Sequence, residues 1–289
     1  MTSATQSFGG AVLLIFVSAQ AQNLFVSDYS GNIFQFTQGG ARSTFASGTS
    51  NPQGLAFNNQ GDLFEADNGS GNIYEFTPGG TQSTFATGLS YPLGLAFDNS
   101  GNLFEADAGS GQIIEFTAGG MQSTFASGLN SPTSLAFNGA GDLFVSNYGG
   151  SDILEFTPSG METTFASVID PRGLAFNSAG NLFVVSLDSI YAYTPGRLRS
   201  TYASALTTPD GLAFNQAGNL FVSEQVAGEV LEITPSRTKS IFASGLGVSG
   251  NGPDFLTFRV EETPEPSVVW LLLMSAAGFL IKWNFKVAN

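Results

Sequence analysis

The sequence contains no cysteine and no histidine among its 289 residues. Without cysteine, disulfide bonds and thiolate metal sites are excluded, so the fold must rest on its hydrophobic core. Without histidine, the chain cannot form Ser-His-Asp or Cys-His nucleophile pairs, histidine-ligated zinc or a histidine general base. The chemistry that remains uses oxygen. Asp, Glu, Asn and Gln can hold Ca²⁺, Mg²⁺ or Mn²⁺, and paired carboxylates can do acid–base work.

Positive charge is also scarce, since 9 Lys and Arg stand against 23 Asp and Glu, which gives a formal net charge of -14. This field does not attract nucleic acid or anionic membrane surfaces, so we expect no nucleic-acid partner. The simplest role of the excess carboxylates is to keep an acidic surface soluble.

Helical periodicity is missing as well, because no window keeps the 3.6-residue apolar spacing over the length that a helix needs. A motif of four short apolar runs bounded by Gly, Asn, Ser and Pro is instead repeated over residues 23–258. Its Leu-Phe pair recurs every 38 to 40 residues, at Leu24, Leu63, Leu103, Leu143, Leu182 and Leu220. This period predicts an all-β fold, a six-bladed β-propeller of four-stranded blades.

The ends of the repeat predict how the ring closes. The chain enters the repeat at the second strand of a unit, in residues 23–28, and the missing first strand appears only at residues 253–258. Pairing of these N- and C-terminal strands would complete the sixth blade and remove an exposed edge. Most of the 27 phenylalanines recur at equivalent positions, where we expect them to pack between stacked blades.

Two positions of the repeat are expected to face one mouth of the central channel. In a propeller the loop before the first strand and the loop after the second lie on the same face of the disc. The variable residue of Pro-x-Gly begins the first strand and reads Gln53, Leu93, Thr133, Arg172, Asp210 and Asp254. The last residue of the second strand forms a second ring, which reads Asp28, Asp67, Asp107, Asn147, Ser186 and Glu224.

The neighbours of the variable residue of Pro-x-Gly hardly differ among the repeats, whereas this residue itself does. Such a position is where a ring of similar blades can form an asymmetric site. We predict a ligand site formed by Gln53, Arg172, Asp210 and Asp254, with Arg172 paired to Asp210. The candidate metal ligands are Asp210, Asp254, Asp28 and Glu224, and calcium suits such an all-oxygen set. The alternative for the second ring is that each side chain caps the turn after its strand. No residue is assigned a catalytic role.

A set of glutamates also recurs through the repeat. Second strands carry Glu65 and Glu105, and third strands carry Glu75, Glu115, Glu155 and Glu232. This stripe is interpreted as solvated blade surface, or as hydrogen-bonded to the Ser-Thr pairs of the fourth strands. It is given no chemical role.

The repeat resembles the NHL repeat in three features: Pro-x-Gly-Leu-Ala-Phe-Asn, a Gly-Asn-Leu-Phe-Val-x-Asp strand and a following Asn-x-Ile strand. The resemblance covers residues 23–258. NHL propellers are related in form to the gluconolactonase, or senescence-marker, family of six-bladed metal-dependent lactonases. That relationship implies metal ligands around the axial mouth, typically Glu, Asn and Asp, where this chain carries Asp210, Asp254 and Gln53.

Both ends outside the repeat have features of targeting segments. Residues 11–17 form a hydrophobic run followed by Ala19-Gln-Ala21, which resembles a signal peptide over residues 1–21 with a mature start at Gln22. The first ten residues contain no Lys or Arg, which departs from the usual signal-peptide start. The propeller domain is therefore expected over residues 22–259.

Residues 260–289 resemble the PEP-CTERM sorting signal of Gram-negative bacteria. They contain the tripeptide Pro264, Glu265 and Pro266, then a hydrophobic stretch over residues 268–281, then two lysines. The resemblance implies recognition by an exosortase-type enzyme, a short hydrophobic helix, and membrane contact only through this segment before processing. A simple C-terminal anchor is the alternative, although the stretch is shorter than the ~20 residues of a typical span.

Together these features predict an exported propeller at the cell envelope or in the extracellular polysaccharide matrix. It would act as a rigid binding or structural module for a small-molecule, glycan or protein ligand. The alternative is a metal-dependent hydrolase of lactones or related esters, with calcium as its cofactor.

Overall fold

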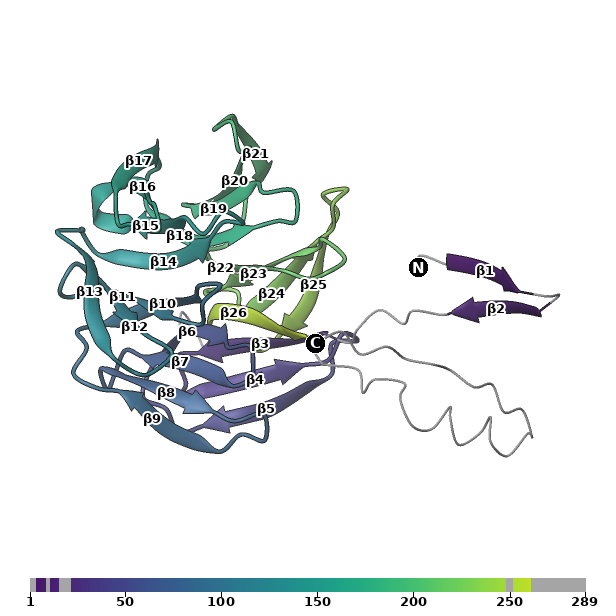
Figure 1. Cartoon of the computed structure of the whole chain (residues 1–289), viewed down its shortest axis with the longest axis horizontal. Coiled ribbons are helices and arrows are strands. Elements are labelled where there is room, and N and C mark those ends of the chain that lie inside the picture. The colour runs from purple at the N-terminus through teal and green to yellow at the C-terminus, as the bar shows by residue number, and fades with distance from the viewer. Residues whose placement is uncertain (1–3, 9–10, 16–21, 248–251, 261–289) are drawn as a thin grey trace. The chain divides into compact units, whose positions relative to one another are not determined.

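The computed structural model describes residues 4–8, 11–15, 22–247 and 252–260 (Figure 1). Residues 22–259 form one compact unit, and the described residues before it contribute β1 (Ala4–Phe8) and β2 (Ala11–Ile15), an antiparallel hairpin. Cleavage of a signal peptide that includes this hairpin stays a prediction. The proposed sorting residues 264–266 and the hydrophobic stretch after them lie outside the described residues. No helix in the described part of the chain is long and apolar enough to cross a membrane.

The main unit is a six-bladed β-propeller with four strands in each blade, which confirms the predicted fold class. Blade 1 contains β26 (Pro253–Val260), β3 (Gln22–Asp28), β4 (Asn32–Phe36) and β5 (Arg42–Ser47). Blade 2 contains β6 (Pro52–Phe57), β7 (Leu63–Asp67), β8 (Asn72–Phe76) and β9 (Gln82–Ala86). Blade 3 contains β10 (Pro92–Phe97), β11 (Leu103–Asp107), β12 (Gln112–Phe116) and β13 (Gln122–Ser127).

The second half of the ring repeats this order. Blade 4 contains β14 (Pro132–Phe137), β15 (Leu143–Asn147), β16 (Asp152–Phe156) and β17 (Glu162–Ser167), with a 3₁₀ turn η1 (Tyr148–Gly150) after β15. Blade 5 contains β18 (Pro171–Phe176), β19 (Leu182–Ser186), β20 (Ser189–Tyr193) and β21 (Arg199–Ala203). Blade 6 contains β22 (Pro209–Phe214), β23 (Leu220–Glu224), β24 (Glu229–Ile233) and β25 (Lys239–Ser244).

Blade 1 closes the ring, because β26 from the far end of the repeat lies beside β3 from its start (Figure 1). The Ser27 hydroxyl accepts the backbone N–H of Phe255 at 3.2 Å and donates to the backbone oxygen of Gln53 at 2.8 Å. One side chain thus links the closing strand to the first strand of the next blade. The predicted closure by N- and C-terminal strands is confirmed.

The first strands of blades 2 to 6 are irregular where they start, and this irregularity shapes the mouth of the channel. In blade 2, Pro52 pairs with Asp67 and Leu55 pairs with Glu65, so the first strand holds one extra residue between these pairs. A Cβ added to Gly54 in this bulge would lie 2.1 Å from the backbone oxygen of Leu93 in the next blade. The glycine therefore lets neighbouring first strands approach closely, which brings the adjacent variable residues together across blades.

The hydrophobic core lies between the blades. The ring of Phe25 contacts Phe45 and Phe57 edge to face, with ring centroids 5.1 and 4.9 Å apart. The same arrangement recurs around Phe64, Phe104, Phe144, Phe183 and Phe221. Each such pair contributes roughly 0.5–1.5 kcal/mol beyond the apolar area it buries. The predicted role of the repeated phenylalanines is confirmed.

The interpretation of the glutamate stripe as solvated surface is wrong for Glu65 and Glu105, which are fully buried. Neighbouring blades cover second strands on both faces, and the other four blades carry valine here, at Val26, Val145, Val184 and Val222. Burial, reinforced by Asp67, raises the pKa of Glu65 to about 9. Burial and then Asp107 raise the pKa of Glu105 well above its usual value. The Glu65 carboxyl group is therefore neutral at physiological pH, and burial shifts that of Glu105 in the same direction.

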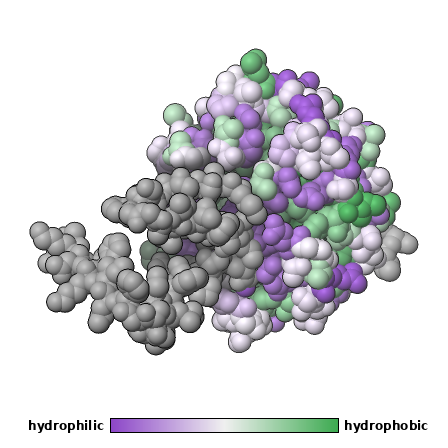
Figure 2. Space-filling model, turned by 90° about the vertical axis from the view of Figure 1, so that its right-hand side faces the viewer, coloured by the Kyte–Doolittle hydropathy of each residue, from purple (hydrophilic) through white to green (hydrophobic). Residues whose placement is uncertain are grey.

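On the face that Figure 2 shows, hydrophilic and hydrophobic residues are interspersed. The large apolar side chains with high exposure, such as Tyr91, Met121 and Leu198, come from different parts of the ring. Scattered exposure of this kind is normal for a folded domain.

Candidate functional site

Asp210 and Asp254 meet at the mouth of the channel, where β22 and β26 begin. Both are buried, with 8% and 1% of their surface exposed. The side-chain amide of Gln225 lies between them. Its Nε2 donates to Oδ2 of Asp210 at 2.7 Å and also to Oδ1 of Asp254. Two carboxyl groups from neighbouring blades are thus joined through one amide group.

Arg172 approaches the same pair from blade 5. Its Nη1 donates to Oδ2 of Asp210 at 3.0 Å, which is the predicted pairing. The guanidinium group also stacks on the ring of Tyr148, 5.4 Å from the ring centre. Because 38% of the Arg172 side chain is exposed, its remaining donors can reach a ligand in the mouth.

Asp254 is the carboxyl group of the pair whose protonation is most perturbed. Its pKa is raised well above the usual value, first by burial and then by the nearby charge of Asp210, while the amides of Gln225 and Gln53 offset part of the rise. Burial also raises the pKa of Asp210, but Arg172 opposes that shift. Asp254 therefore retains a proton to higher pH than Asp210 does.

One oxygen of Asp254 is unsatisfied. Oδ2 is buried and has no hydrogen-bond partner among the described residues, although Oδ1 receives the Gln225 amide. The carboxyl group as a whole also interacts with the side chains of Asp210, Gln53 and Tyr29. A buried carboxyl oxygen without a partner costs free energy, and a ligand hydroxyl or cationic group that reached it would remove that cost. The mouth thus contains a prepared acceptor, and when Asp254 is protonated it also contains a donor.

Tyr29 forms part of the rim above this oxygen. It follows β3, and 36% of its surface is exposed. Burial raises the pKa of its hydroxyl, and the nearby charges of Asp254 and Asp210 raise it further. Tyr29 therefore presents a neutral phenol and a partly open ring beside the carboxyl pair.

Gln53, the last predicted ligand residue, lies against Asp254 from blade 2. It is buried, and its Nε2 donates to Oδ1 of Asn51 at 3.1 Å. Its amide lowers the pKa of Asp254. The structure therefore brings Gln53, Arg172, Asp210 and Asp254 into one sector of the mouth.

The second ring caps turns. Backbone amides donate to Asp67 from Ser50 at 2.5 Å and from Ser70 at 2.8 Å. Glu224 accepts the amide of Thr207 at 2.8 Å, and Asp28 accepts that of Ser30 at 2.7 Å. Asp28 and Asp67 thus cap the turns after their strands, as the alternative predicts, whereas Glu224 bonds the loop before the first strand of its own blade.

The site also contains residues that the sequence reasoning missed. Gln225, Tyr29 and Tyr148 each occupy the position just after the second strand. Around the ring this position reads Tyr29, Asn68, Ala108, Tyr148, Leu187 and Gln225. It varies as widely as the x of Pro-x-Gly, so the same comparison of equivalent positions would have identified it.

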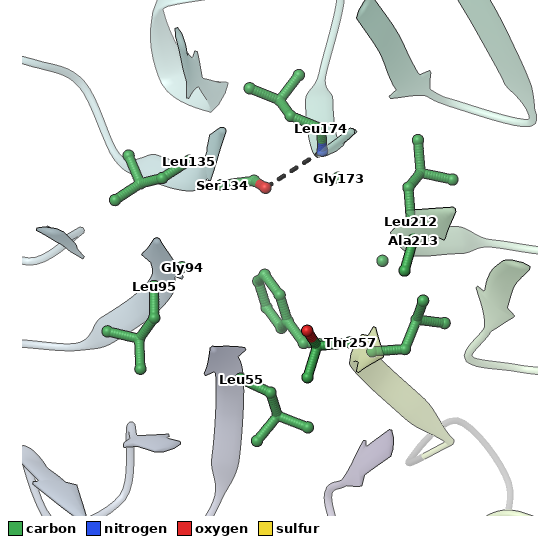
Figure 3. A pocket seen from close by; sticks show the side chains of 13 residues that line it. Leu55, Gly94, Leu95, Ser134, Leu135, Gly173, Leu174, Leu212, Ala213 and Thr257 are labelled. Carbon is green, nitrogen blue, oxygen red and sulfur yellow. Dashed lines mark hydrogen bonds between the residues drawn. The ribbon is translucent and has the colours of Figure 1, made fainter. Parts of the chain in front are cut away.

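Deeper along the axis the channel is lined by the backbone of the first strands and by a few side chains. Figure 3 shows leucines from successive first strands around a cavity of about 160 Å³. The leucines are Leu55, Leu95, Leu135, Leu174, Leu212 and Leu256. Phe255 and Thr257 also line the cavity, where the other blades carry Gly or Ser and Ala. The charged side chains are therefore found at the mouth, and none of the residues that line this cavity is charged.

The side chains at the mouth do not fit a divalent cation. The described residues contain no cluster of three or more Asp or Glu arranged to hold a metal ion. Oδ2 of Asp210 faces two N–H donors, from Arg172 and Gln225, and the guanidinium charge would repel a cation. The expectation of calcium binding therefore rests on the sequence pattern alone.

No protein-family model matches the sequence, and no curated protein matches it. Solved structures do match. A chain from a nidogen/laminin complex is 17% identical, with a TM-score of 0.75 over 84% of this chain and 100% of that chain. A catalytically inactive histidine-to-alanine variant of virginiamycin B lyase from Staphylococcus aureus, solved with quinupristin, is 15% identical, with a TM-score of 0.63 over 90% and 97%. A gluconolactonase from Xanthomonas campestris is 17% identical, with a TM-score of 0.65 over 83% and 88%. Identities this low show the fold alone.

Proposed function

We propose that the protein is a binding module whose channel mouth holds a polyhydroxyl ligand, such as a saccharide. The observation that carries this proposal is the unpartnered Oδ2 of Asp254, buried at the mouth beside Asp210 and the rim residue Tyr29. Vicinal hydroxyl groups both donate and accept hydrogen bonds. They therefore match a site that combines carboxyl oxygens with a guanidinium group.

Each side chain has a distinct part in this binding mode. Asp254 bonds one ligand hydroxyl through Oδ2, and Arg172 donates to a second from its exposed N–H groups. Tyr29 covers an apolar face of the sugar ring with its own ring. Gln225 holds the two carboxyl groups in position, so the site is largely formed before the ligand arrives.

We also propose that this module is exported and sorted to the cell envelope or extracellular matrix of a Gram-negative bacterium. The support comes from the signal-peptide features of residues 1–21 and from the Pro-Glu-Pro tripeptide with its hydrophobic stretch and basic end. An exosortase-type enzyme would be the processing partner.

A metal-dependent lactonase remains the alternative, because gluconolactonases are among the solved structures with this fold. The mouth does not supply the ligand set that such a metal needs, as described above. The lyase neighbour loses activity when a histidine is replaced, and this chain has no histidine to take that role. A binding function therefore agrees better with the side chains that are present.

The test is thermal unfolding of the purified protein with a panel of neutral mono- and oligosaccharides. A ligand of the folded state raises the melting temperature by mass action. We expect at least one saccharide to stabilise the wild type and not Asp254→Asn. Glu162→Gln, which changes an exposed carboxylate on an outer strand, serves as the control and should respond like the wild type.

The same assay distinguishes the proposed saccharide site from the alternative, a metal-dependent lactonase. Calcium is expected to leave the melting temperature unchanged, and hydrolysis of simple lactones should not depend on a chelator. If calcium stabilised the wild type but not an Asp210→Asn, Asp254→Asn variant, the mouth would be a metal site, and the proposed saccharide site would be wrong.

A further inference from the structure

Five of the nine positive side chains lie on the outer edge of three consecutive blades. They are Arg197 and Arg199 in blade 5, Arg237 and Lys239 in blade 6, and Arg42 in blade 1. All five are exposed, and they lie on the outer strands β21, β25 and β5 or in the turns just before two of them (Figure 1). These turns and outer strands contain no Asp or Glu. We call these five side chains the cationic edge.

Two of these arginines occupy a backbone conformation that favours glycine. The turn before each outer strand has a residue with positive φ, and blades 1 to 4 use Gly40, Gly80, Gly120 and Gly160 there, at 79° to 83°. Blades 5 and 6 instead carry Arg197 at 61° and Arg237 at 65°. L side chains rarely adopt this region, so turn geometry alone does not account for an arginine here.

The positive groups are held in place by the neighbouring blade. Arg197 stacks on Phe165 and pairs with Glu155 at 2.7 Å, and Arg237 stacks on Tyr202. Lys239 donates to the backbone oxygen of Ser204 at 2.7 Å, and Arg42 donates to that of Gly245 at 3.1 Å. These contacts order the side chains, and each exposed guanidinium group, with its five N–H donors, keeps donors that these bonds do not use.

We propose that the cationic edge binds an acidic polysaccharide, whose carboxylate groups pair with the five side chains. Three equivalent sites on successive blades suit a long chain with separated charges better than a compact ligand. Nucleic acid has a much denser charge and is disfavoured by the net charge of the chain. This surface is separate from the channel mouth, and its test does not depend on the saccharide proposed there.

The experiment measures binding of the whole protein to immobilised polygalacturonate, with neutral dextran as the reference polymer. The variant combines Arg197→Gly, Arg237→Gly, Arg199→Gln, Lys239→Gln and Arg42→Gln. Each replacement is a residue that this chain already uses at the same position in another blade. The variant should therefore fold, and thermal unfolding checks this. We expect binding to polygalacturonate and not to dextran, weakening as salt rises, and a loss of roughly tenfold or more in the variant.

Two double variants with the same net charge distinguish the loss of a local binding site from a general effect of the more negative charge. Arg199→Gln with Lys239→Gln makes the net charge two units more negative on blades 5 and 6, and Gln82→Glu with Gln122→Glu does the same on blades 2 and 3. Only the first pair should weaken binding. The proposal is overturned if both pairs weaken it equally, if polygalacturonate does not bind, or if duplex DNA binds as tightly.

Discussion

Replacing Glu65 by valine is expected to stabilise the protein, and the gain should depend on pH. Glu65 has no exposed surface, and neither of its carboxyl oxygens has a hydrogen-bond partner in the described part of the chain. In the folded protein its pKa is about 9, against an ordinary value of 4.5. Between these two values the folded state holds a proton that the unfolded state has released, so stability falls as pH rises.

The size of the effect follows from the same two values. Each unit of pH above the ordinary pKa costs about 1.4 kcal/mol until the folded pKa is reached, so near pH 7 the cost is about 3 kcal/mol. Unfolding free energies of domains are only about 5–15 kcal/mol. For a domain of this size the gain corresponds to a melting temperature about 6 to 12 °C higher. Near pH 4 this proton-linked part of the gain should vanish, because the carboxyl group is then protonated in both states.

The assay is denaturant unfolding of wild type, Glu65→Val and Glu65→Gln across that pH range. Valine is the residue of the other blades at this position, so the replacement should fit the core. Glutamine cannot ionise but keeps a buried polar group. It should therefore remove the pH dependence and lack the added apolar stabilisation. An advantage of Glu65→Val that is equal near pH 4 and pH 7 would refute the reasoning, because Glu65 would then not be held neutral in the folded state.

Three further predictions concern closure, the mouth and sorting. Truncation before Gly252 removes β26 and should cost several kcal/mol of stability. Truncation after residue 262 keeps β26 and should not. Equal melting temperatures of the two truncated proteins would contradict the closure. Gly54→Ala places a Cβ 2.1 Å from the backbone oxygen of Leu93 and should lower the melting temperature, unlike Gly139→Ala, whose Cβ meets nothing within 4 Å. In a host with the sorting machinery, intact mass should show loss of the segment beyond residues 264–266; full-length protein would favour a simple anchor.

Much of the fold could be predicted because the same pattern of four strands recurs six times in the sequence. The closure was visible as a missing first strand at one end and an extra one at the other. The pairing of Arg172 with Asp210 was also predictable, because the bulge of β18 and its Gly173 let this strand approach β22 and so bring the two variable residues together. Equivalent positions in neighbouring blades are neighbours in space, and this holds for any propeller.

The remaining features depend on contacts that the repeat pattern does not encode. Gln225 joins two carboxyl groups of different blades, and comparison within the repeat does not say which side chain bridges them. Glu65 has the residue type of a surface position, but blade stacking buries the second strand on both sides. Asp28 and Glu224 are predicted as metal ligands because the sequence shows their acidity but not their backbone partners, Ser30 and Thr207.

Calorimetric titration of the best saccharide from the thermal panel into three proteins tests the central claim most directly. Wild type and Glu162→Gln should bind with the same affinity. Asp254→Asn should bind roughly tenfold to a hundredfold more weakly, because a hydrogen bond to a buried carboxyl group is lost. Equal affinity in all three proteins would contradict the account, because the unpartnered oxygen of Asp254 would then not be the ligand site.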